Sequence, residues 1–305
     1  MQDHKRILPI IILILFLALP TFAQWAGTKV ALWGDWGDIT ALDILNGPGG
    51  KAHQPGTNFK FIEESKSGTA PKFYVEDENG AKWKVKLGQE VKSETAATRL
   101  LWAAGYFVDE DYYLPQIRVQ GMKPLSRGRE YVSGDGLVRE ARLELQGQGK
   151  KLNNWSWDQN PFVGTKEFNG LRVMMALINN WDVKDINNDI VDVDGVSRYE
   201  VGDLGASLGS TGNVFGRSKS VMKDYAKSKF IQKVTPESVD FVFHAKIGSL
   251  GKSIPIADAR WLGNRLGQFS PEQIRDCFRA AGYSPNEVEG YAKIVMQRID
   301  ALKKL

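Results

Sequence analysis

The chain has 305 residues and a formal net charge of +4, and 42% of its residues are hydrophobic while 25% are charged. This is ordinary globular composition, which excludes a disordered chain, and the small net charge excludes a global attraction to nucleic acid or to a membrane surface. We therefore expect no nucleic-acid partner. Cys277 is the only cysteine, and no His/Cys zinc spacing exists, so any bound metal ion is expected to have oxygen ligands.

The first 23 residues are predicted to be a signal peptide. Residues 4–6 are basic, residues 7–19 are almost continuously apolar, and Ala23 ends a small-residue cleavage site. The apolar run is shorter than the roughly 20 residues that span a bilayer. We expect cleavage, export to the periplasm, the extracellular space or a secretory lumen, and a mature chain with no transmembrane domain. An uncleaved membrane anchor is the alternative.

The next part of the chain is predicted to be an irregular arm followed by a strand-rich domain. Residues 24–58 are rich in Gly, Trp and Pro, which favours tight turns over regular structure. Residues 59–147 then alternate polar and apolar side chains in several short runs, and Asn79-Gly80 is a strong hairpin signal. The expected strands are FKFIEE, KFYVED, KWKVK, YYLPQIRVQGM and GLVREARLEL, with a helix over residues 93–104 that Gly105 ends.

Residues 148–305 are predicted to be mostly helical, after a flexible-looking segment at residues 146–151. Thr165 can cap a helix that runs to about Asn179, and Ser270 and Ser284 begin two further helices with Pro at the next position. A strand-rich half followed by a helical half predicts an α+β fold of two lobes with a cleft between them.

Alternation in the segment KWKVKLG suggests how a charged pair could form in the cleft. The apolar side chains share one face of a strand and the lysines share the other. On the next helix, Glu94 lies on the same stripe as Ala97 and Leu101, which turns its carboxylate inward. Because a buried carboxylate needs a cationic partner, we expect an ion pair with Lys86, with Lys84 as the alternative. Such a pair can position the phosphates of a nucleotide.

Two later segments, WDVKDINN and GDLGASLG, carry the residue types that phosphoryl transfer from Mg-ATP requires. Asp182 can orient a hydroxyl group, and Asn187 and Asp203 can hold a metal ion on the phosphates. The plainer alternative is that these residues, with Gly205, only form turns and helix caps.

These segments resemble those of kinases. KLGQEVKSE resembles the Lys-x-Gly segment that leads to an acidic residue in phosphoinositide kinases, and DLGASLG is similar to their DFGHILG. WDVKDINN keeps the Asp-to-Asn spacing of protein-kinase and phosphoinositide-kinase catalytic loops. The resemblance extends to a broader atypical group that includes HipA-like and secretory-pathway kinases. It implies a two-lobed protein kinase-like fold with an antiparallel β N-lobe containing one helix.

The resemblance also implies roles for individual residues. Asp182 matches the catalytic Asp, Lys184 the catalytic-loop Lys, Asn187 the metal-binding Asn and Asp203 the metal Asp. This chain departs from the pattern at Trp181 and Leu204 and in having no GxGxxG loop. In place of that loop, Ser67 and Gly68 would cover the phosphates with hydroxyl and backbone donors.

The sequence therefore predicts an exported atypical kinase that uses ATP and Mg²⁺ or Mn²⁺ to phosphorylate an unidentified hydroxyl acceptor: a protein, a lipid or a small molecule. One alternative is an inactive pseudokinase that serves as an exported binding protein. Another is nucleotidyl transfer with ATP bound in a different orientation. Lys219, Lys223 and Lys227 recur every four residues and are expected to form a solvated helix face.

Overall fold

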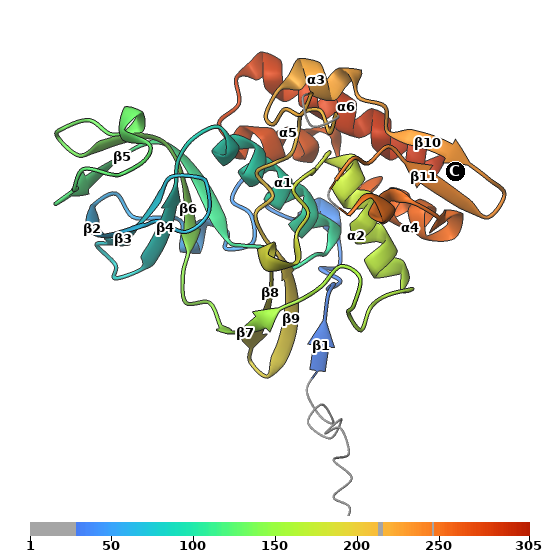
Figure 1. The fold of residues 1–305 in the computed structure, drawn as a ribbon, viewed down its shortest axis with the longest axis horizontal. Coiled ribbons are helices and arrows are strands. Elements are labelled where there is room, and N and C mark those ends of the chain that lie inside the picture. The colour runs from blue at the N-terminus through green and yellow to red at the C-terminus, as the bar shows by residue number, and fades with distance from the viewer. Residues whose placement is uncertain (1–28, 213–215, 246) are drawn as a thin grey trace, which may run out of the picture.

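The computed structural model describes residues 29–212, 216–245 and 247–305. The predicted signal peptide at residues 1–23 lies outside these ranges. No helix within them is both long and apolar enough to cross a membrane. The described chain has strands of one lobe at one end, helices of the other lobe at the opposite end, and a single helix, α1, between them (Figure 1).

The first lobe is a five-stranded barrel. Its strands follow the order β2-β3-β4-β6-β5 around the barrel. The parallel pairing of β2 with β5 closes the barrel, and the other neighbouring strands are antiparallel. The predicted alternation is present, since Trp83 and Val85 are fully buried inside the barrel. The barrel strands are β2 (Phe59–Ser65), β3 (Lys72–Asp77), β4 (Lys82–Lys86), β5 (Asp111–Gln120) and β6 (Leu137–Leu145). All five runs that were predicted as strands are therefore strands.

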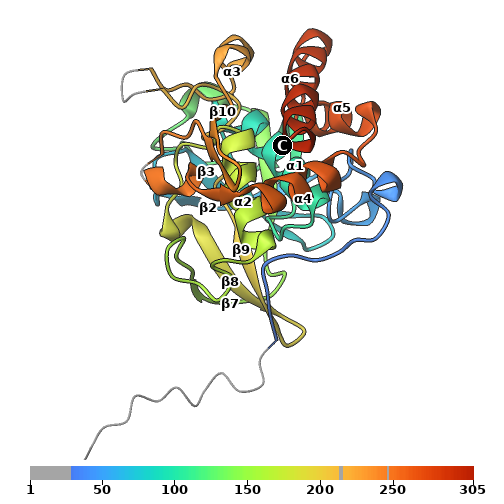
Figure 2. The ribbon, with the colours of Figure 1, turned by 90° about the vertical axis from the view of Figure 1, so that its right-hand side faces the viewer.

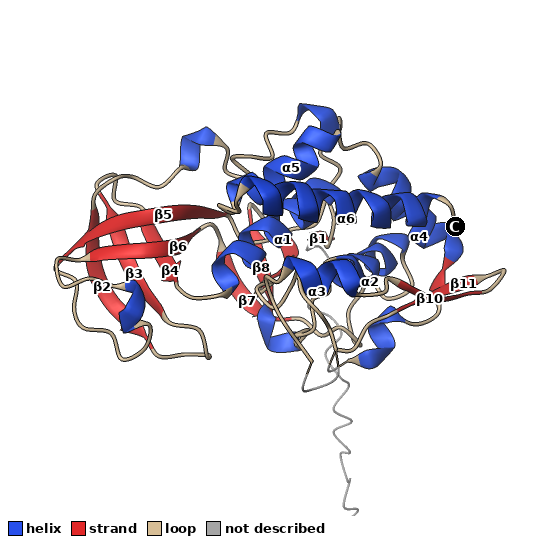
Figure 3. Ribbon diagram, turned by 90° about the horizontal axis from the view of Figure 1, so that it is seen from above, coloured by secondary structure: helices blue, strands red, loops and turns tan. Residues whose placement is uncertain are grey.

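Helix α1 (Glu90–Ala104) connects β4 to β5 and begins three residues before the predicted start. Its apolar side chains belong to the core of the helical lobe, where Leu100 and Leu101 are fully buried. As predicted, the helix ends at Gly105, whose φ of 113° lies in the left-handed region and whose N–H bonds back to Leu101. Viewed from above, α1 lies between the barrel and the other helices (Figure 3).

The second lobe packs five helices within the described residues, and α4 and the C-terminal end of α6 lie toward the viewer in Figure 2. The predicted caps are present, because the Thr165 hydroxyl accepts a bond from the Phe168 N–H and Ser270 forms a capping box with Gln273. The helices are α2 (Lys166–Leu177), α3 (Met222–Lys227), α4 (Ile256–Leu266), α5 (Pro271–Ala280) and α6 (Pro285–Lys303).

The sequence analysis missed two small sheets. One has the order β1-β9-β8-β7 and the other the order β10-β11-β12. Strand β7 starts within the segment predicted to be flexible, and β1 lies in the arm predicted to be irregular, so both predictions were wrong at these positions. The strands are β1 (Lys29–Ala31), β7 (Lys150–Asn154), β8 (Asn188–Val193), β9 (Val196–Val201), β10 (Ile231–Val234), β11 (Ser238–Phe241) and β12 (Ile254–Pro255).

The rest of the arm ties the two lobes together. On the helical side, the Gln273 amide donates to the carbonyl oxygen of Ile39 at 2.8 Å. On the barrel side, His53 Nδ1 lies 3.0 Å from the carboxylate of Glu110. Earlier in the arm, the Trp33 indole donates to the carbonyl oxygen of Ala104 at the end of α1. The arm therefore fixes the end of α1 as well as the two lobes.

Gly105→Ala should lower the free energy of unfolding by about 3 kcal/mol or more. A Cβ atom there would lie 2.1 Å from Trp33 Nε1 and 2.7 Å from the Gly34 carbonyl oxygen, besides forcing a side chain into a positive φ. Urea denaturation measures the loss. Gly121→Ala is the matched control, because Gly121 also has positive φ but no atom near the Cβ position, and it should cost only about 1–2 kcal/mol. Equal losses would contradict the close packing of the arm on α1.

Candidate functional site

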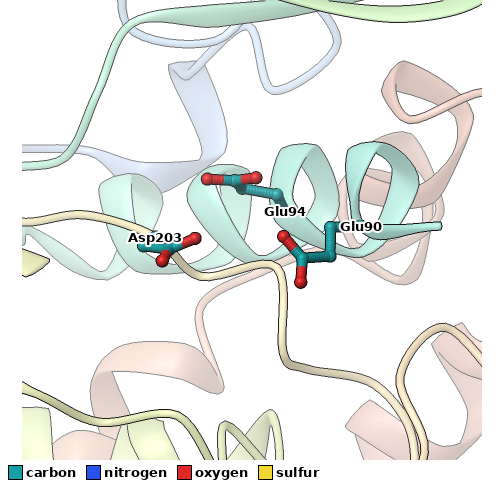
Figure 4. A group of neighbouring side chains, drawn as sticks. All are labelled: Glu90, Glu94 and Asp203. Atoms are coloured by element: carbon teal, nitrogen blue, oxygen red, sulfur yellow. The ribbon is translucent and has the colours of Figure 1, made fainter. Parts of the chain in front are cut away.

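Three segments meet around the ammonium group of Lys86, the last residue of β4. Its Nζ atom lies 2.7 Å from a carboxylate oxygen of Glu94 and 2.8 Å from one of Asp203. Glu90, one turn before Glu94 on α1, supplies a third oxygen at 2.8 Å. Figure 4 shows the three carboxylates turned toward one another. Their oxygens are close enough together to hold a metal ion, but in this arrangement the Lys86 ammonium group lies among them.

The predicted ion pair is therefore present, and Lys86 forms it. Lys84 instead pairs with Glu144 on β6. Burial lowers the pKa of Lys86, but Glu94, Asp203 and Glu90 outweigh it and raise the pKa above its ordinary value. Burial conversely raises the pKa of Asp203, but Lys86 outweighs it and the pKa is lowered. Both groups are thus held in their charged forms.

The turn that begins at Asp203 is docked directly onto α1. The Ser93 hydroxyl donates to the carbonyl oxygen of Gly205 at 2.7 Å. A Cβ atom on Gly205 would lie 2.6 Å from the Cβ of Glu90, so only glycine permits this approach. Asp203 itself has a φ of 51°, which is uncommon for a residue other than glycine. The Asp-x-Gly sequence therefore allows a tight turn that brings the Asp203 carboxylate to Lys86.

The predicted catalytic loop lies beside this turn. The Gly202 N–H donates to the carbonyl oxygen of Asn187 at 3.0 Å, which holds the two segments together. Lys184 Nζ lies 2.6 Å from a carboxylate oxygen of Asp182. The Asn187 amide nitrogen donates to the carbonyl oxygen of Asp182 at 3.2 Å, so the amide oxygen remains available as a ligand.

The smaller of two neighbouring cavities reaches Lys86, Asn187 and Asp203, while Asp182 and Lys184 line neither cavity. The smaller, of about 200 Å³, is lined by Lys86, Glu94, Asn187 and Asp203 among others. The larger, of about 810 Å³, extends to the linker between β6 and β7. Both are lined by the same four charged side chains: Asp109, Glu144, Lys151 and Asp189. Together they have the size of a small-molecule site.

Ser67 and Gly68 lie on an exposed loop between β2 and β3 and do not line either cavity. Arg127 fixes this loop by donating to the carbonyl oxygen of Gly68 at 2.6 Å. Lys72, at the end of the loop, does line the smaller cavity. The role of Ser67 and Gly68 in covering phosphates stays a prediction.

Arg142 on β6 is a buried residue of the site that the sequence analysis missed. Its guanidinium group lies 2.5 Å from Asp111, 2.8 Å from Glu144 and 3.6 Å from Glu94, so it is a second cation for Glu94. Alternation along β6 could have placed Arg142 opposite Lys86, with which it pairs in register. The carboxylates that neutralise it could not be identified in this way, because they come from three different elements.

Lys219 does not belong to a solvated helix face, so that expectation was wrong for this residue. It precedes α3, and its Nζ atom lies 2.5 Å from a carboxylate oxygen of Glu90. Lys223 and Lys227 are exposed on α3, as expected.

The side chains around the smaller cavity fit a divalent cation and a phosphate group. The Asn187 amide oxygen and the Asp203 carboxylate are the hard oxygen ligands that Mg²⁺ and Mn²⁺ prefer. Lys72 and Lys86 add positive charge at the same cavity. A site with both kinds of group can bind a metal ion and the phosphates that it bridges.

Comparison with known proteins supports the fold. No protein-family model matches the sequence, and no curated protein is significantly similar to it. The structure is similar to a crystal structure of a Helicobacter pylori proinflammatory kinase, CtkA, with a TM-score of 0.50 and 12% sequence identity. The match covers 82% of this chain and 98% of that chain. The chain therefore has the predicted kinase-like fold, while its relation to the phosphoinositide or HipA-like group stays a prediction.

The carboxyl group of Glu200 should make stability depend on pH. Glu200 lines the larger cavity, and burial, with the nearby Asp109, raises its pKa to about 8. In the unfolded chain the pKa is near the ordinary glutamate value of 4.5. Between these two values the native state keeps a proton that the unfolded state releases, so the stability present at low pH is lost as the pH rises toward 8.

When the pH rises from 5 to 8, we expect the melting temperature of Glu200→Gln to fall by less than that of the unchanged chain. Melting temperatures at both pH values measure the difference. Glu237→Gln is the control, because Glu237 is exposed, and it should follow the unchanged chain. The same pH dependence in Glu200→Gln and the unchanged chain would show that Glu200 is not buried in its neutral form.

Proposed function

We propose that this chain is an atypical kinase that transfers a phosphoryl group from ATP, with Mg²⁺ or Mn²⁺, to a hydroxyl group of an acceptor. The observation that carries the proposal is the contact of Lys86 with both Glu94 and Asp203, beside Asn187, in one cavity of a kinase-like fold. Two segments that are distant in sequence, one with Lys86 and Glu94 and one with Asn187 and Asp203, supply residue types that phosphoryl transfer uses, which supports the proposal.

In this proposal Lys86 binds the nucleotide phosphates and Glu94 fixes its orientation. Glu94 is 3% exposed and pairs with Lys86, so moving the ammonium group away would leave a buried carboxylate with only the more distant Arg142 as its cation. Asp203 and Asn187 hold the metal ion. When bound, the ion would neutralise the negative charge on the phosphates during transfer.

Asp182 is proposed to orient the acceptor hydroxyl group and to accept its proton. Lys184 contacts both carboxylate oxygens of Asp182, at 2.6 and 2.8 Å, which fixes the orientation of the carboxylate. A correctly placed general base contributes roughly 10²–10⁴-fold to a rate.

The acceptor and the location of the protein are separate proposals. The basic and apolar pattern of residues 4–19 supports export, so the acceptor would be met outside the cytoplasm. The acceptor would present a hydroxyl group to Asp182, as a protein, a lipid or a small molecule can.

Metal-dependent nucleotide binding that requires Asp203 is the test of the proposal. At a hundred times its dissociation constant, Mg-ATP should stabilise the folded chain by about 2.7 kcal/mol, which is visible as a higher melting temperature. Asp203→Asn should abolish this shift, because the amide keeps the shape but loses the charge that binds the metal. Asp194→Asn is a matched control, since Asp194 has a φ of 54°, close to the 51° of Asp203, and is exposed in the β8–β9 turn.

Asp182→Asn separates binding from chemistry. It should keep the Mg-ATP shift and lose transfer of the γ-phosphate, whether the assay uses an acceptor or water. No shift with any nucleotide in the unchanged chain would contradict the proposal. A shift without transfer would indicate the nucleotide-binding pseudokinase, and transfer of the α-phosphate would indicate nucleotidyl transfer.

A further inference from the structure

All three N–H donors of the Lys86 ammonium group face carboxylate oxygens in this structure. A lysine ammonium group has three N–H donors. Carboxylate oxygens of Glu94, Glu90 and Asp203 lie 2.7–2.8 Å from it, which accounts for all three. A nucleotide phosphate can therefore bind Lys86 only if one of these carboxylates moves away.

Glu94 is the partner least able to move. Its side chain is 3% exposed, and its other cation, Arg142, is more distant at 3.6 Å and is shared with three further carboxylates. Release of Glu94 from Lys86 would leave a buried carboxylate poorly compensated, which is costly. The side chain of Asp203 is 43% exposed and can turn toward a metal ion, as the proposed function requires.

Glu90 is the partner whose charge has another cation close by. One of its carboxylate oxygens lies 2.8 Å from Lys86, and the other lies 2.5 Å from Lys219. Burial raises the pKa of Glu90, but the two lysines outweigh it and keep the group ionised. Glu90 can therefore release Lys86 without becoming an uncompensated charge, provided that Lys219 is present.

Packing holds Glu90 at the point where this exchange would take place. Its side chain passes over Gly205, where an added Cβ atom would lie 3.1 Å from Oε2 of Glu90. Lys219 reaches Glu90 from the segment that follows the Asp203 turn, and the neighbouring Ser220 N–H bonds to the carbonyl oxygen of Ser207. The position of Lys219 is thus set by the same part of the chain that places Asp203.

We propose that Glu90 and Lys219 are positioning residues that set how readily Lys86 becomes available to the nucleotide. Glu90 occupies one donor of Lys86 in this structure. On nucleotide binding, the Glu90 carboxylate breaks its contact with Lys86 and keeps its contact with Lys219. The freed N–H donor of Lys86 then binds a phosphate oxygen. The inference rests on the proposed function, because it requires that a nucleotide binds at Lys86.

A double-mutant cycle tests the inference. Isothermal titration with ATP and Mg²⁺ gives the dissociation constant of the unchanged chain, Lys219→Gln, Glu90→Gln and the double variant. Lys219→Gln should weaken ATP binding about three- to tenfold, because Glu90 is then left with Lys86 as its cation. In the Glu90→Gln background the same change should have an effect of less than about twofold, because no carboxylate remains to compete for Lys86.

Two further variants separate this role from a structural one. Lys219→Arg keeps the charge and should bind ATP as the unchanged chain does. Lys223→Gln removes an exposed lysine four residues away and should also leave the affinity unchanged. A loss of stability alone would move the melting temperatures but would not make the effect of Lys219 depend on Glu90.

The outcomes are distinct. If Lys219→Gln weakens ATP binding equally with and without Glu90, Lys219 acts on the nucleotide directly and the inference is wrong. If Lys219→Gln does not fold, Glu90→Gln alone decides, because the inference requires that it bind ATP at least as tightly as the unchanged chain. If the unchanged chain binds no Mg-ATP, the proposed function fails and the inference fails with it.

Discussion

The charge of Lys86 must be neutralised inside the protein, and this requirement links the parts of the structure that form the site. A buried ammonium group is stable only beside carboxylates. Lys86 receives them from α1 and from the turn after β9, so the barrel, the helix and the helical lobe are held in one arrangement by a single group. The contacts that stabilise this arrangement are those that a nucleotide and a metal ion would have to replace.

The position of α1 depends on contacts on several sides. Its apolar face packs in the core of the helical lobe, and the arm contacts its last turn through Trp33. Buried Arg99 on α1 pairs with Asp111 on β5, which in turn pairs with Arg142. Breaking one member of such a buried network leaves an unpaired charge, so the network favours one position of α1 over others. Glu94 is consequently held where Lys86 can reach it.

Local patterns predicted the parts of the fold that depend on local chemistry. Alternation identified the barrel strands, and cap residues such as Thr165 and Ser270 identified helix starts. Strand β7 was missed because its sequence, KKLNN, is polar and exposed on most of its length, and it is a strand through its pairing with β8. Closure of the barrel by β2 and β5 was likewise not visible, because it depends on pairing between distant segments.

The same distinction applies to the site. Periodicity placed Lys86 and Glu94 on facing sides of a strand and a helix, and the structure brings them together. Glu90 could have been found, because it lies four residues from both of them. Lys219 could not, since it is 129 residues from Glu90 and no local pattern relates the two. Long-range pairs of this kind follow from the fold rather than from spacing.

A crystal structure of the chain with Mg²⁺ and an ATP analogue that cannot transfer its γ-phosphate is the most direct test of this account. The account predicts that Lys86 keeps its contact with Glu94 and binds a phosphate oxygen, while Asp203 leaves Lys86 and binds the metal ion with Asn187. A nucleotide bound outside the cavity of about 200 Å³, or bound there while Lys86 stays paired with Asp203, would contradict it.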